Sequence, residues 1–149
     1  MIKVIAVFLF FTFHCGSNDS PLLWISQIPK PWEIDEKDFD KYLGEFQIRF
    51  PDFHQRVKAI NLWRVGTPYG IYCLGEELGI DDDPILRADT SDCTVHVLTT
   101  LAFANSSTWS EARNKMIQIH YNPDSLHNYL PSFQSRCHFT SDRILNHNQ

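Results

Sequence analysis

The sequence lacks the features that mark several large classes of protein. Its 149 residues include no block of lysine and arginine and carry a net charge of −5, which gives no support for nucleic-acid binding. The four cysteines form no Cys-x-x-Cys pair, which argues against a zinc ribbon and against a thioredoxin-type motif. We therefore expect no metal, no cofactor and no nucleic-acid partner.

What is present is enough apolar material for one folded domain. The chain is 43% hydrophobic, with four tryptophans and eleven phenylalanines, which excludes a disordered or fibrous protein. A length of 149 residues leaves room for one domain and not two. We place this domain at residues 35–149.

The first residues have the pattern of an export signal. Lys3 precedes an apolar run from Val4 to Phe13, which is too short to span a bilayer, and Cys15 and a short polar segment follow it. This order resembles a bacterial lipoprotein signal, in which Cys15 would be acylated. An ordinary cleaved signal and an uncleaved anchor are the alternatives. We expect a signal peptide at 1–15 and a proline-containing tether at 16–34.

The domain is expected to be rich in helix. Apolar residues recur at helical spacing in three segments, at 39–46, 53–64 and 93–104. A fourth helix is predicted to begin at a capping box formed by Thr108 and Glu111. No segment alternates in the way that a half-buried strand does. Residues 66–91 are expected to be a long loop, whose acidic stretch from Asp81 to Asp83 lacks the spacing of a calcium loop.

The most informative pair is Asp92-Cys93, at the start of the third of these helices. Unpaired backbone N–H groups and the helix dipole at that position favour a thiolate, the form of cysteine that attacks carbonyl carbons. The segment before it supplies helix-capping residue types, from Asp89 to Asp92. Cys93 is therefore a candidate nucleophile. The alternative is a buried cysteine that only packs.

A nucleophilic thiol needs a base, and the sequence leaves the choice open. His96 is on the same helix and would flank the thiol, whereas His120, His127 and His138 could reach it only through the fold. Cys73 and Cys137 would be the remaining cysteines, and an exported protein could join them in a disulfide.

Several motifs together resemble a family of bacterial cell-wall proteins. The chain is similar to the N-acetylmuramoyl-L-alanine amidase-like proteins, relatives of the papain-like cysteine peptidases of the NlpC type. The resemblance spans roughly residues 50–145. It is carried by Gly66-Thr67-Pro68-Tyr69, Leu74-Gly75-Glu76, Pro84 to Arg87, Asp89, Asp92-Cys93-Thr94, Leu101-Ala102, Trp109 and Ser135 to Asp142.

The resemblance implies an α+β, papain-like fold and cleavage of an amide bond in peptidoglycan stem peptides. It implies Cys93 as the nucleophile and His138 as a second catalytic residue. Tyr69 would back the active site, Asp92 would bind a substrate amine or fix the helix start, and Arg136 falls in the Arg-x-His motif as a substrate-binding residue. The implied partners are peptidoglycan fragments and, through a lipid on Cys15 only, the membrane of the cell envelope.

Two departures from the family pattern point to an alternative function. Arg143 stands where the family has a tryptophan, and no His-Val-Gly-like strand follows the cysteine helix. We therefore expect a chain that covers mainly the helix-rich N-terminal half of the fold and is incomplete at its C-terminus. The alternative function is an inactive envelope lipoprotein with a substrate-binding or purely structural role.

Overall fold

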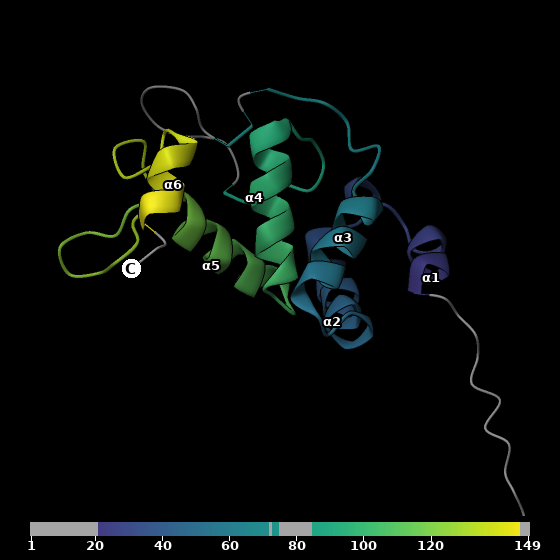
Figure 1. Ribbon diagram of the computed structural model, residues 1–149. Helices are drawn as coiled ribbons and strands as arrows, with labels where there is room; N and C mark the ends of the chain where they lie inside the picture. The colour runs from purple at the N-terminus through teal and green to yellow at the C-terminus, as the bar shows by residue number, and fades with distance from the viewer. Residues whose placement is uncertain (1–20, 72, 75–84, 147–149) are drawn as a thin grey trace, which may run out of the picture.

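The computed structural model describes residues 21–71, 73–74 and 85–146 (Figure 1). In this part of the chain the regular structure is helical. The elements are α1 (Pro21–Gln27), η1 (Pro31–Glu33), η2 (Glu36–Asp38), α2 (Phe39–Arg49), α3 (Phe53–Trp63), α4 (Cys93–Ala104), α5 (Trp109–His120) and α6 (Thr140–Asn146).

The helical half of the expected α+β fold is confirmed, but the sheet is not seen in the described residues. Two isolated bridges, Tyr69 with Ser91 and Tyr121 with Arg136, are the β-type pairings that join these segments. The papain-like arrangement is therefore not confirmed. A sequence with no alternating apolar pattern has no strand whose one face could be buried, which agrees with this result.

Helix α4 is the centre of the fold. It lies between α2 and α3 on one side and α5 on the other, and Figure 1 shows it flanked by these elements. The buried residues of α4 occupy most of its circumference, apart from the side of Cys93 and Val97: Val95, Leu98, Thr99, Thr100, Ala102, Phe103 and Ala104. A helix that is apolar on most sides must be covered on most sides.

Aromatic rings fill the space between α4 and its neighbours. Phe39 contacts Trp63, Phe103 and Trp109, with ring centroids 6.0, 5.5 and 4.5 Å away. Trp63 also packs against Phe46 at 5.1 Å. The rings are tilted against one another, with interplanar angles of 59°, 37°, 48° and 43°, and do not stack face to face. These five rings come from four helices and fix how α2, α3, α4 and α5 sit together.

The helix starts follow the sequence closely. Asp52 accepts a hydrogen bond from the backbone N–H of Gln55 at 2.9 Å and so caps α3. Thr108 caps α5 by accepting from the N–H of Glu111, as predicted. The returning bond of that capping box goes to the N–H of Ser107, one residue earlier than expected. Both caps satisfy donors that the first turn leaves open.

The segment expected to be a tether is helical in its described part. Within α1, Ile25 is buried and Trp24 packs edge-on against Phe46 at 4.9 Å, so this helix joins the core. The expected signal peptide, Cys15 and the acidic stretch from Asp81 to Asp83 lie outside the described residues. In the described ranges, none of the helices has the length and apolar character that crossing a bilayer requires.

The aromatic core leads to a stability prediction. Replacing Phe103, which is fully buried, with alanine should cost about 3–5 kcal/mol in the free energy of unfolding, because the lost ring leaves a cavity between three aromatic neighbours. Phe139 is 70% exposed, so Phe139→Ala is a matched control that should cost less than about 1 kcal/mol. Urea denaturation of both variants measures the difference. Equal losses would contradict the proposed core.

Candidate functional site

Cys93 is the first residue of α4 and its side chain is exposed. Both expectations for this residue, the helix start and the accessible thiol, are confirmed. Asp92 caps the helix: its carboxylate accepts from the N–H of Val95 at 2.8 Å. In the described part of the chain, the N–H groups of Cys93 and Thr94 have no acceptor. Two backbone donors therefore stand open beside the thiol.

A second segment lies against the start of α4. The N–H of Ser91 donates to the carbonyl of Pro68 at 2.9 Å, and the N–H of Gly70 donates to the carbonyl of Ser91 at 3.3 Å. This pairing places Tyr69, which is 79% exposed, opposite Ser91, two residues before Cys93. The segment that holds Tyr69 is thus paired with Ser91, the residue before Asp92, although more than twenty residues separate the two segments.

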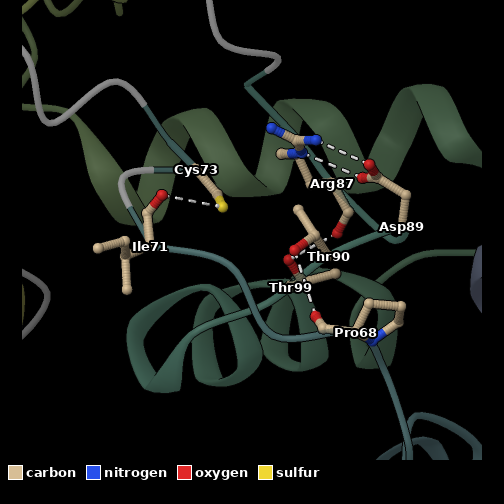
Figure 2. A network of polar contacts seen from close by, with 7 residues as sticks. All are labelled: Pro68, Ile71, Cys73, Arg87, Asp89, Thr90 and Thr99. Carbon is tan, nitrogen blue, oxygen red and sulfur yellow. Dashed lines mark hydrogen bonds and ion pairs between the residues drawn. The ribbon is translucent and has the colours of Figure 1, made fainter.

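Gly70 lies at a close approach within that pairing. A Cβ atom at this position would collide with Oγ1 of Thr90 and would lie 2.9 Å from Sγ of Cys73. Figure 2 shows Thr90 bonded to the carbonyl of Pro68, and Cys73 bonded to the carbonyl of Ile71. A residue without a side chain is what allows the two segments to approach this closely.

The segment just before Cys93 is also hydrogen-bonded to Thr99, in the middle of α4. Arg87 forms a two-pronged ion pair with Asp89, at 3.0 and 2.7 Å, and this hydrogen bonding lowers the pKa of Asp89 from its ordinary value. The hydroxyl of Thr99 donates to the carbonyl of Arg87 at 3.2 Å (Figure 2). Residues 87–91 are therefore held along α4, which fixes where the helix begins.

A pocket of about 420 Å³ opens beside the thiol. Its walls come from α4, from the end of α5 and from α6. Most of the lining side chains are apolar, and the charged one is Arg143. The lining residues are Cys93, Thr94, Val97, Leu98, Leu101, Ile119, Thr140, Arg143 and Ile144. This volume is within the range of small-molecule sites.

Behind the pocket wall, Arg143 is held by a buried histidine. Nδ1 of His120 lies 3.2 Å from Nη2 and 3.4 Å from Nε of Arg143. Since a guanidinium can only donate, Nδ1 carries no proton. Burial is the main reason that the pKa of His120 is lowered to about 3, and the charges of Arg143, Arg136 and His138 add to the effect. A backbone contact with Leu74 opposes it.

These two residues were not among the predicted site residues. His120 was one of the open alternatives, and it follows Ala112 and Met116 at intervals of four on the buried face of α5. That periodicity could have placed its ring in the interior. Arg143 stood out in the sequence only as a departure from the family motif. Its position in the pocket comes from the packing of α6.

Arg136 and His138 lie in the segment that connects α5 to α6. The N–H of Cys137, between them, donates to the carbonyl of His120 at 2.8 Å, so this segment runs beside the end of α5. Arg136 is buried, while His138 is exposed, with Nε2 3.1 Å from the carbonyl of Phe133. Neither residue lines the pocket beside Cys93. The described structure does not bring His138 into hydrogen-bond contact with the thiol.

His96 is occupied elsewhere. Its Nε2 lies 2.8 Å from Oδ1 of Asn61 on α3, and its backbone carbonyl accepts a hydrogen bond from the buried Arg64. Burial, followed by the charge of Arg64, lowers the pKa of His96. The His96 ring therefore links α3 to α4. Its Nε2 is bonded to Asn61 and does not serve as a base for Cys93.

The other cysteines of the described chain differ from Cys93. Cys73 and Cys137 are both buried, and the disulfide between them that was considered from the sequence is not formed. In the described ranges, His, Cys, Asp and Glu side chains do not gather in groups of three or more that could bind a metal ion.

An exposed cysteine at a capped helix start, beside a pocket, makes Cys93 a candidate nucleophile. The sequence profile of the AmiA-like family, described as N-acetylmuramoyl-L-alanine amidase-like, matches residues 60–149. The chain therefore belongs to this family, as the motifs around Cys93 predicted. No curated protein and no solved structure matches the chain.

The exposure of the three described thiols predicts their order of reaction. Iodoacetamide on the native protein should modify Cys93 well before Cys73 or Cys137, because the last two are 5% and 1% exposed. Peptide mass spectrometry after short exposure identifies the modified residue. Modification of Cys93 only after denaturation would contradict this site.

The buried His120 predicts a pH dependence of stability. Its folded pKa of about 3 lies below the ordinary value of 6.5, so between these values the unfolded chain binds a proton that the folded chain refuses. Stability is fully present above pH 6.5 and is lost as pH falls toward 3. At pH 5 the loss from this group should be about 2 kcal/mol.

Urea denaturation at pH 7 and pH 5 measures that loss. His120→Gln should flatten the difference between the two pH values, whereas the exposed control His54→Gln should leave it unchanged. The same difference in the wild type and in His120→Gln would show that His120 is not the group responsible.

Proposed function

We propose that this protein is a cysteine-dependent amidase that cleaves an amide bond of peptidoglycan stem peptides in the cell envelope. Membership of the amidase-like family supports the substrate class. The observation that carries the proposal is the exposed Cys93 at the capped start of α4, on the rim of a pocket.

Cys93 would attack the carbonyl carbon of the amide. Its sulfur forms a bond to that carbon, and the carbonyl oxygen becomes an oxyanion. The open N–H groups of Cys93 and Thr94 are suitable donors for this oxygen, because they are fixed by the helix before the charge develops. Collapse of the intermediate releases the amine and leaves an acyl thioester, which water then hydrolyses.

Asp92 and Tyr69 would act around this centre. The carboxylate of Asp92 already accepts from Val95, which fixes the first turn of α4 and so the direction of the thiol. The Tyr69 side chain is exposed next to Ser91, where its hydroxyl could bind the substrate near the oxyanion. Arg136 is buried in the segment that follows α5, so it would contact substrate only if this segment moved.

His138 is our candidate for the base. Among the described histidines, His120 has a pKa too low to accept a proton near neutral pH and already binds Arg143. His96 is bonded to Asn61. His138 is exposed and belongs to the family motif. Because its Nε2 contacts the carbonyl of Phe133 and not the thiol, it would have to approach Cys93 when substrate is bound. Catalytic hydrogen bonds are often longer without substrate than in the reacting complex.

The test is release of stem peptides from purified peptidoglycan. We expect release by the wild type to exceed that by Cys93→Ala, and His138→Ala to lower the rate by about 10²- to 10⁴-fold. His127→Ala, which changes another exposed histidine, is the control that should keep the wild-type rate. Equal release by the wild type and Cys93→Ala would contradict the amidase proposal.

A second function is favoured by one observation. In the described chain no imidazole forms a hydrogen bond with the Cys93 thiol. A protein of this kind could bind stem peptides in the envelope without cleaving them. Calorimetric titration with a soluble stem peptide separates the two functions, since binding without any Cys93-dependent release supports the second.

A further inference from the structure

The pocket beside Cys93 is larger and less polar than a short peptide substrate requires. Its volume of about 420 Å³ has room for roughly a dozen methylene groups, if each fills about the 30 Å³ of a water molecule. The methyl group of an alanine would fill only a small part of it. The pocket therefore fits a group of many carbons.

The shape of the pocket follows α4 away from the thiol. Val97 and Leu101 succeed Cys93 at intervals of four along one face of the helix, so they form a stripe that begins at the sulfur. Ile119 and Ile144 form the facing walls. A linear chain attached at the sulfur would run along this stripe.

The part of the pocket wall that Arg143 forms is held in place by the contact between Arg143 and His120. Two nitrogens of the guanidinium lie within 3.4 Å of Nδ1 of His120, and His120 is itself buried. The aliphatic stem of Arg143 thus contributes apolar surface to the pocket.

We propose that this pocket is an acyl-chain subsite, and that Cys93 accepts linear aliphatic acyl groups of about six to ten carbons from activated esters, thioesters or amides. The reaction forms a bond between Sγ of Cys93 and the acyl carbon and breaks the bond from that carbon to the leaving group. The thiol proton passes to solvent or to the departing group. The inference rests on the proposed function for Cys93 as the nucleophile, but not on peptidoglycan as the substrate.

The experiment measures acylation of Cys93 by p-nitrophenyl esters of acetate, butyrate, hexanoate and octanoate. The release of p-nitrophenolate gives the rate, and intact-protein mass spectrometry gives the acyl group added. Rates are divided by those of free N-acetylcysteine, which removes the intrinsic reactivity of each ester. We expect the corrected rate to rise at least tenfold from acetate to octanoate, because each buried methylene strengthens binding about three- to fourfold.

Leu101→Trp tests whether the pocket is responsible. Leu101 is only half-buried, so a larger ring at this position should fill the pocket without disturbing the core. Leu62→Trp is the matched control, because Leu62 is 49% exposed on α3 and does not line the pocket. The dependence on chain length should disappear in Leu101→Trp and persist in Leu62→Trp, while iodoacetamide should label Cys93 at similar rates in both.

The outcomes separate this inference from the proposed function. Corrected rates that do not change with chain length, or that change equally in Leu101→Trp and the wild type, would overturn the acyl subsite. Peptidoglycan cleavage with no chain-length dependence would leave the amidase proposal standing alone. Graded acylation without peptidoglycan cleavage would support the subsite and contradict the amidase proposal.

Discussion

The burial of α4 is the constraint on which the rest of the structure depends. Seven of its twelve residues are buried, and they include Phe103, which contacts rings from α2, α3 and α5. Burying this much apolar surface is the largest favourable contribution available to a chain of this composition. The neighbouring helices are arranged so that this one helix is covered.

The same constraint explains why Cys93 is reachable. Helix α4 meets solvent along the side that carries Cys93 and Val97, and its N-terminal end carries the open backbone donors. Asp92 caps this end, and the paired segments at 68–70 and 90–91 hold it at the surface. Stability and chemistry are therefore separated along a single element, with the core at its middle and C-terminal part and the thiol at its start.

The charged groups near the pocket are arranged around His120. A buried imidazole with a pKa of about 3 stays neutral under ordinary conditions, so it can accept from Arg143 without adding charge to a region that already holds Arg136 and His138. His120 is the last residue of α5. It gives α6 a fixed attachment, and α6 in turn closes the pocket beside Cys93.

The sequence by itself determined the local features. The spacing of apolar residues located α2, α3, α4 and α5, and capping residues placed their starts within a few residues, because a helix depends on neighbours three and four positions away. It also identified Asp92-Cys93 as the chemically distinctive pair and, through its motifs, the amidase-like family. The tertiary structure decided what depends on residues distant in the chain. It paired the Tyr69 segment with Ser91, bonded His96 to Asn61, and placed Arg143 and His120 next to the pocket, whose described lining does not include His138. No periodicity encodes such pairings, since they follow from how helices pack around α4.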